Sequence, residues 1–114
     1  MYKYKIFNNI APEGTDYLVK ENLILNEEEP EALLLRSKVL HENDFNDELL
    51  CIGRAGAGVN NIPIDIASKK GVVVFNTPGA NANAVKELVL CGLLLSSRGI
   101  IQGNSFAKSL KIDE

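Results

Sequence analysis

Three short, unbroken apolar runs limit the folds open to this chain more than any other feature. They cover Ala32 to Leu35, Leu49 to Ile52 and Val72 to Phe75, and a polar or glycine-containing segment follows each. Continuous runs of this length, rich in leucine, isoleucine and valine, are typical of strands buried on both faces of a parallel sheet. We therefore expect an α/β fold, a flavodoxin-like parallel sheet with helices on both faces.

Helix-compatible segments lie between these runs, as they do in parallel α/β sheets. Two further strands are expected, at Lys5 to Phe7 and at Leu23 to Leu25. The expected helices are one opened by Ala11-Pro12, one over Glu42 to Glu48, and one from Pro63 to Lys70 that ends at Gly71.

The segment from Asn83 to Arg98 is the best helix candidate, and apolar side chains cover most of its circumference. Such a helix lies inside a core or packs against another domain or subunit. We expect residues 1–82 to form the sheet domain, and residues 83–114 to contain a long apolar linker and dimerisation helix that leads to a further domain. A homo-oligomer is the expected assembly.

Composition excludes several classes of partner. The chain has 114 residues, and its 12 lysines and arginines are scattered among 15 acidic residues, so no basic stripe suits a nucleic acid. No apolar run approaches the roughly 20 residues that span a bilayer. Cys51 and Cys91 are far apart and are expected to be buried free thiols in a reducing compartment, so the domain is expected to be soluble and cytoplasmic. His41 has no partner for a metal site or a catalytic triad.

The glycine-rich stretch CIGRAGAGVNN, residues 51–61, follows an apolar run as a dinucleotide-binding turn would. That fingerprint needs three glycines, an immediate helix and an acidic residue about 20 positions on. Here Asn61 stands at the third glycine position, Pro63 delays the helix, and the next strand ends in Asn76. The stretch fails as a dinucleotide fingerprint.

The same loop can still bind an anion. Gly56 and Gly58 permit positive φ and a close approach of backbone N–H groups to a ligand. Arg54 ends one strand, and Arg36-Ser37 follow its neighbour, so these groups would meet at the carboxyl edge of the sheet. We interpret them as a site for a small dianion. The simpler alternatives are surface salt bridges for the arginines, a turn role for Ser37, and helix capping by Asn81 or Asn83.

Four linked motifs resemble the D-isomer-specific 2-hydroxyacid dehydrogenases. They are LLLRSK at 33–38, GRAGAGVNNI at 53–62, KKGVVVFNTPGANANAVKELVL at 69–90 and LLLSSRGI at 93–100. The resemblance extends over nearly the whole chain. It implies two α/β domains with a cleft between them, of which this chain contains the N-terminal part of the substrate domain.

The resemblance also implies roles for individual residues. Backbone amides of the glycine loop hold the substrate carboxylate in that family, which assigns this role to Gly56 with Ala55 beside it. Arg36, Ser37, Arg54 and Asn81 match substrate-binding positions. Ala57 matches a cofactor-contacting position that often carries threonine, so its hydroxyl contact is lost. Asn60 replaces a common aspartate.

The implied activity is NAD-dependent oxidation of a small phosphorylated 2-hydroxyacid. In the family, the arginine, glutamate and histidine of the chemical step lie further along the sequence, so these 114 residues are expected to be an inactive fragment. Hydroxyacids without a phosphate remain an alternative. So do a non-catalytic anion-binding flavodoxin-like module and a dehydrogenase-related scaffold. A signalling receiver is disfavoured, because Asn8-Asn9 supply no acidic cluster after the first strand.

Overall fold

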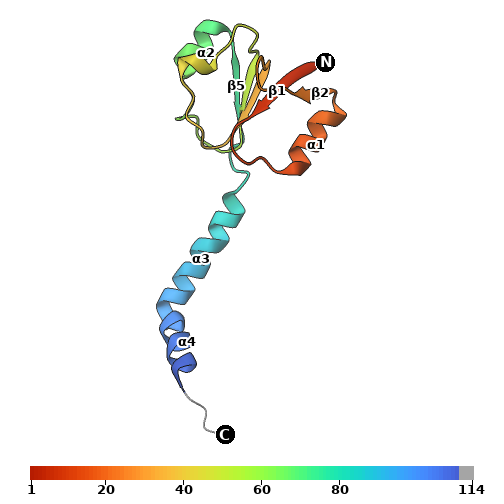
Figure 1. Ribbon diagram of the computed structural model, residues 1–114. Coiled ribbons are helices and arrows are strands. Elements are labelled where there is room, and N and C mark those ends of the chain that lie inside the picture. Colours follow the sequence, from red (N-terminus) through yellow and green to blue (C-terminus); the bar gives the residue numbers. More distant parts are fainter. Residues whose placement is uncertain (111–114) are drawn as a thin grey trace. The chain divides into compact units, whose positions relative to one another are not determined.

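The computed structural model describes residues 1–110, which form two compact units divided between Pro78 and Gly79. The first unit holds a five-stranded sheet with helices and turns (Figure 1). Its elements are β1 (Tyr2–Ile6), α1 (Pro12–Lys20), β2 (Leu23–Leu25), β3 (Ala32–Leu35), the short 3₁₀ turn η1 (Glu42–Asp44), β4 (Cys51–Arg54), α2 (Ile64–Lys70) and β5 (Val73–Asn76).

All neighbouring strands of the sheet are parallel, in the order β2-β1-β3-β4-β5. This is the flavodoxin-like order, so the expected parallel α/β fold is confirmed. The register pairs Leu35 with Arg54 and Arg54 with Asn76. The carboxyl ends of β3, β4 and β5 are therefore level with one another, and the segments that follow them begin at the same edge.

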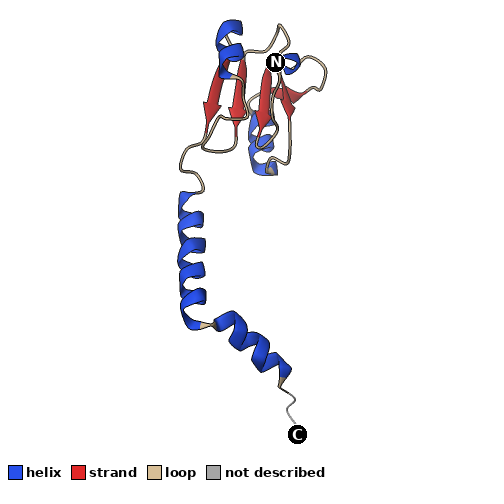
Figure 2. Ribbon diagram, turned by 90° about the vertical axis from the view of Figure 1, so that its left-hand side faces the viewer, coloured by secondary structure: helices blue, strands red, loops and turns tan. Residues whose placement is uncertain are grey.

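Right-handed crossovers place the two helices of this unit on opposite faces of the sheet. The chain moves from β1 to β2 in one direction along the sheet and from β3 towards β5 in the other. As a result, α1 covers the β1–β2 end of one face, and α2 covers the other face near β5 (Figures 1 and 2).

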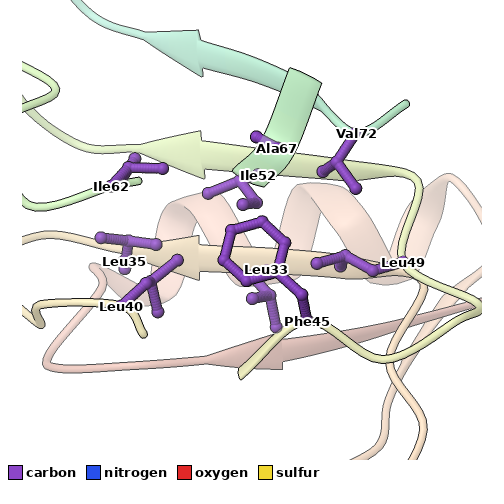
Figure 3. Close-up of a cluster of buried hydrophobic side chains, with 9 residues drawn as sticks. All are labelled: Leu33, Leu35, Leu40, Phe45, Leu49, Ile52, Ile62, Ala67 and Val72. Atoms are coloured by element: carbon purple, nitrogen blue, oxygen red, sulfur yellow. The ribbon is translucent and has the colours of Figure 1, made fainter. Parts of the chain in front are cut away.

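The core lies between the sheet and α2 (Figure 3). Leu33, Leu35 and Ile52 alternate along β3 and β4 towards this face and are almost inaccessible to solvent. They pack with side chains from the connections and from α2, namely Leu40, Phe45, Leu49, Ile62, Ala67 and Val72. Burying several such side chains, each contributing about 1.5–3 kcal/mol, stabilises the strands that position the site.

The predicted helix from Glu42 to Glu48 was wrong, because only η1 forms there. The Asp44 carboxylate accepts the N–H of His41 at 2.8 Å, which caps the start of this turn. Asn46 Oδ1 accepts the N–H of Glu48 at 2.8 Å, the group that a continuing helix would bond to the carbonyl of Asp44. This local bond competes with helix formation.

The second unit contains α3 (Ala82–Arg98) and α4 (Ile100–Ser109). The long helix was predicted within one residue of its start, whereas α4 was not predicted. Gly99, at φ 59°, ends one helix and begins the other. Most large apolar side chains of both helices are exposed, including Leu88 and Leu94. The last four residues, part of the expected lead-in to another domain, lie outside the described residues.

None of the helices in residues 1–110 is both long enough and apolar enough to cross a membrane. Both cysteines are free thiols, as expected, but the prediction that both are buried was wrong. Cys51 is half-buried on β4, and Cys91 on α3 is exposed. Burial raises the pKa of the Cys51 thiol.

Candidate anion-binding loop

Two turns meet at the carboxyl edge of the sheet, one after β3 and one after β4. The first comprises residues 36–38, and the second, which we name the glycine loop, comprises residues 55–58. The N–H of Ala55 donates to the carbonyl of Leu35 at 2.8 Å, which joins the beginnings of the two turns. Five of the predicted substrate-binding residues, Arg36, Ser37, Arg54, Ala55 and Gly56, and the predicted cofactor contact Ala57, are thus brought together.

Asn8 organises the first turn. Its side-chain oxygen accepts the backbone N–H groups of Arg36, Ser37 and Lys38 at 3.3, 3.0 and 2.9 Å. Asn8 itself has φ 71°, a left-handed conformation that asparagine adopts more readily than most residues. The amides of this turn are therefore already occupied, and what remains for a ligand is its side chains.

The Arg36 side chain is exposed. Within residues 1–110 the ion pairs are Lys3–Glu29, Lys5–Glu27 and Lys70–Asp47, so neither Arg36 nor Arg54 takes part in one. The alternative that these arginines serve as surface salt-bridge partners is not supported there. Ser37 contributes its N–H to the turn.

In the glycine loop, surrounding groups hold three consecutive carbonyls. Gly56 O accepts the N–H of Thr77 at 3.0 Å, and Ala57 O accepts Asn76 Nδ2 at 2.7 Å. Gly58 O accepts Nη1 of Arg54. The end of β5 and the side chain of Arg54 therefore fix the orientation of three successive peptide units.

That orientation determines where the loop's N–H groups point. In a trans peptide the C=O and the following N–H point in opposite directions, and residues 1–110 contain no cis peptide. The N–H groups of Ala57 and Gly58 therefore point away from Asn76 and Thr77. The N–H of Val59 points away from Arg54. None of these three N–H groups donates a hydrogen bond to any atom of residues 1–110.

The Gly56 N–H, expected to hold a carboxylate, donates to Arg54 O at 2.9 Å. Gly56 and Gly58 do not adopt the positive φ that glycine permits. They provide space instead. A Cβ at Gly56 would lie 3.1 Å from Arg54 Nη1. A Cβ at Gly58 would lie 3.2 Å from the same atom and 3.1 Å from Asn60 Oδ1. The two glycines therefore leave room for the guanidinium to pack against the loop.

Asn61 links the two turns from inside the protein. Its side chain is buried and donates from Nδ2 to the carbonyls of Lys38 at 2.7 Å and Arg36 at 3.3 Å. Its own carbonyl accepts the N–H of Leu40 at 2.9 Å. Sequence reasoning missed this role, although it noted asparagine at the third glycine position.

Asn8, Asn76 and Thr77 were also missed as parts of the site's framework. The signal available was their position, because each directly follows or ends a strand and carries a side chain that can bond a turn backbone. In the sequence, Asn76 stands out only because it occupies the position where a dinucleotide site needs an acidic residue for the ribose.

Asn81 belongs to the second unit, where it is the N-cap residue of α3 without a side-chain capping bond. Asn83, the other candidate cap, lies inside the helix and bonds the side chains of Glu87 and Lys86. Within residues 1–110 no group of three or more metal-ligating side chains is close enough to hold a metal ion.

A cavity of about 180 Å³ adjoins the start of the glycine loop. Ile10, Leu34 and Phe75 contribute carbon-rich walls. The rest of the lining comes from Gly53, Arg54, Ala55, Asn76 and Thr77, and the surface that faces the cavity is almost entirely carbon. These walls offer little to a charged ligand. The chemistry suited to an anion lies in the free N–H groups of the loop and in the exposed guanidinium of Arg36.

Several known proteins are similar to this chain in sequence or in fold. The family model for the catalytic domain of D-isomer specific 2-hydroxyacid dehydrogenases matches residues 6–108. D-3-phosphoglycerate dehydrogenase from Rattus norvegicus is 38% identical over 100 residues, which cover 84% of this chain and 19% of the rat protein. The enzyme of the same name from Methanocaldococcus jannaschii is 35% identical over 94 residues, 80% of this chain and 18% of that protein. The chain thus spans about a fifth of the length of these relatives.

Among solved structures, NAD⁺-bound 3-phosphoglycerate dehydrogenase from Entamoeba histolytica superposes with a TM-score of 0.66 at 23% identity, over 82% of this chain and 38% of that one. At this identity the likeness establishes the fold alone. The sheet order and the family match, which extends over nearly all described residues, lead to one conclusion: the chain belongs to the D-isomer specific 2-hydroxyacid dehydrogenase family.

Proposed function

We propose that this chain is the substrate-binding part of an NAD-dependent D-3-phosphoglycerate dehydrogenase, which oxidises 3-phosphoglycerate to 3-phosphohydroxypyruvate for serine biosynthesis. One observation carries the proposal. The carbonyls of Gly56, Ala57 and Gly58 are held by neighbours, which leaves the N–H groups of residues 57–59 free to bind an anion. Successive free backbone N–H groups are a recurrent binding site for carboxylate and phosphate.

The proposed substrate class rests on two separate anion-binding features at one edge of the sheet. The glycine loop supplies N–H groups that suit a carboxylate, and the exposed side chain of Arg36 suits a second anionic group such as a phosphate. 3-Phosphoglycerate carries both groups on a short carbon chain. Sequence relatives named D-3-phosphoglycerate dehydrogenase support this choice.

In this proposal the chain positions the substrate rather than transforming it. Ser37, Ala55 and Gly56 shape the site beside Arg36. Ala57 lies on the side of the nicotinamide. In the parent enzyme the hydride passes to NAD, which is held mainly by the nucleotide-binding domain. The site residues of this chain contribute by fixing the C2 hydroxyl relative to the cofactor.

The exposed apolar side chains of α3 suggest the mode of assembly. Leu88, Leu93 and Leu94 are each more than half exposed, and a stable protein rarely leaves so many large apolar side chains uncovered on one helix. We propose that α3 forms a contact between two copies in a homo-oligomer.

The experiment that tests the proposed function measures binding of three anions to the chain by isothermal titration calorimetry. The ligands are 3-phosphoglycerate, D-glycerate and inorganic phosphate. We expect 3-phosphoglycerate to bind most tightly, with a dissociation constant near the millimolar range, about −4 kcal/mol. Equal affinity for phosphate would indicate a generic anion module. Equal affinity for D-glycerate would indicate a hydroxyacid without a phosphate.

A further inference from the structure

We propose that Arg54 is a positioning residue, which holds the glycine loop in its anion-binding shape and does not act chiefly as a direct ligand of the substrate. This inference rests on the proposed function, since it concerns the same loop. Arg54 thus has a different role from the direct substrate binding that the family resemblance implies.

The hydrogen bonds of the guanidinium point to this role. Nε donates to the carbonyl of Arg36 at 3.1 Å, and Nη1 donates to the carbonyl of Gly58. One side chain thus joins the turn after β3 to the far end of the glycine loop. Because arginine presents its donors in a rigid planar fork, both carbonyls are held at a fixed separation.

The bond to Gly58 O has a direct consequence for the ligand site. The peptide unit that contains this carbonyl also contains the N–H of Val59, which must point in the opposite direction. If Arg54 releases the carbonyl, that peptide unit is free to rotate. The N–H of Val59 then loses its fixed direction relative to the N–H of Gly58, whose peptide unit Asn76 still holds, and the anion site loses part of its preorganisation.

The loop glycines provide a second, independent observation. Gly56 has no Cβ where the guanidinium lies, since such an atom would be 3.1 Å from Nη1 and 3.3 Å from Cζ. Its φ is not positive, so alanine is compatible with the backbone there. Alanine at position 56 should therefore disturb the loop only by displacing Arg54.

This coupling gives a test that separates positioning from direct charge contact. A lysine at position 54 keeps the positive charge but cannot hold two carbonyls with a planar fork. If Arg54 serves mainly as a charge near the substrate, Arg54→Lys retains binding. If Arg54 positions the loop, Arg54→Lys weakens 3-phosphoglycerate binding about tenfold or more, as Arg54→Ala does.

The experiment compares the wild-type chain with four variants: Arg54→Lys, Arg54→Ala, Gly56→Ala and the double variant Arg54→Ala/Gly56→Ala. Affinity for 3-phosphoglycerate is measured for each, together with the melting temperature and the ligand-free amide spectrum. We expect Gly56→Ala to weaken binding in the wild-type background and to have no further effect once Arg54 is removed. We also expect the amide signals of Gly58 and Val59 to move in every variant while the melting temperature changes little.

The proposal would be overturned if Arg54→Lys kept wild-type affinity and left the Gly58 and Val59 signals unchanged. It would also be overturned if the affinity losses of Arg54→Ala and Gly56→Ala were additive in the double variant. Failure of the wild-type chain to bind 3-phosphoglycerate would instead refute the proposed function. The ligand-free spectra would still report on the positioning role in that case. Should the Arg54 variants not fold, the Nε–H of wild-type Arg54 provides the check: slow exchange with solvent supports the bond to Arg36, and fast exchange contradicts it.

Discussion

The side-chain oxygen of Asn8 accepts the backbone N–H of Lys38 at 2.9 Å, although the two residues are 30 positions apart in the chain. The same oxygen accepts the N–H of Ser37 at 3.0 Å. The side-chain amide of Asn8, just after β1, therefore anchors the turn that contains Arg36.

Replacing Asn8 should destabilise the protein through this turn. Asn8→Ala removes the acceptor and places a residue with a Cβ in a left-handed conformation that alanine disfavours. We expect the free energy of unfolding to fall by about 2–4 kcal/mol, from lost hydrogen bonds and backbone strain together. Urea denaturation measures the change.

Asn8→Gly is the matched variant, because glycine tolerates the left-handed conformation and removes only the acceptor. It should cost less than Asn8→Ala. Asn9→Ala, at a neighbouring exposed position, should have little effect. An Asn8→Ala protein as stable as wild type would show that the turn holds without this anchor.

Arg36 should contribute to binding and not to stability. Its side chain is exposed and forms no ion pair within residues 1–110. We expect Arg36→Ala to weaken 3-phosphoglycerate binding by about 1.5–3 kcal/mol, the usual value for a hydrogen bond to a charged group, with unchanged unfolding free energy. Lys20→Ala is the control, since it removes a charge at the carboxyl end of α1, near the opposite edge of the sheet. Equal losses of affinity for 3-phosphoglycerate in both variants would mean that binding depends only on the net charge of the protein.

The fold could be predicted because its main determinants are local. The apolar run at Ala32 to Leu35 coincides with β3, and Gly71 ends α2 in the left-handed conformation at φ 73°. The strands β4 and β5 extend one or two residues beyond their apolar runs, to the ends expected from the sequence. Their last residues, Arg54 and Asn76, are polar, and backbone pairing rather than burial keeps them in the sheet.

The site was only partly predictable, because its framework consists of bonds between distant residues. Sequence reasoning brought Arg36, Arg54 and the glycine loop to one edge. It could not show that Arg54 bonds the carbonyl of Arg36, 18 positions earlier. Nor could it show that the Arg54 guanidinium lies where a side chain at Gly56 would be. The asparagine framework was missed for the same reason, since a single polar side chain in a turn has many local uses.

Cys51 should make stability depend on pH in the alkaline range. Burial raises the pKa of its thiol in the folded state, so the folded protein keeps the proton at pH values where the unfolded chain loses it. This contribution is fully present below the unfolded pKa of about 8.5 and is lost as the pH rises through the folded value. We expect unfolding free energy to decline above about pH 8.5 in wild type and to decline less in Cys51→Ser.

Cys91 is the internal control for that prediction, because it is exposed on α3. Cys91→Ser should keep the wild-type alkaline decline. In a chain diluted until it is monomeric, iodoacetamide should modify Cys91 faster than Cys51. Identical pH profiles for wild type and Cys51→Ser would contradict the assignment.

The helix α3 should mediate self-association. Leu88 is 73% exposed and Leu94 is 66% exposed, so charged residues at these positions should block any contact through them without disturbing a core. We expect sedimentation velocity to show a concentration-dependent dimer for wild type and a monomer for Leu88→Glu/Leu94→Glu. Glu87→Gln, on the same helix, is the control and should still associate. A wild-type chain that stays monomeric at high concentration would argue against the proposed interface.

The most direct test of the anion-binding loop is an NMR titration of the ¹⁵N-labelled chain with 3-phosphoglycerate, with inorganic phosphate as the reference. We predict that the amide signals of Ala57, Gly58 and Val59 shift most, because their N–H groups have no partner among residues 1–110. The Gly56 amide, already bonded to Arg54 O, should shift less. Shifts confined to other surfaces, or equal shifts with phosphate alone, would contradict a substrate site formed by this loop.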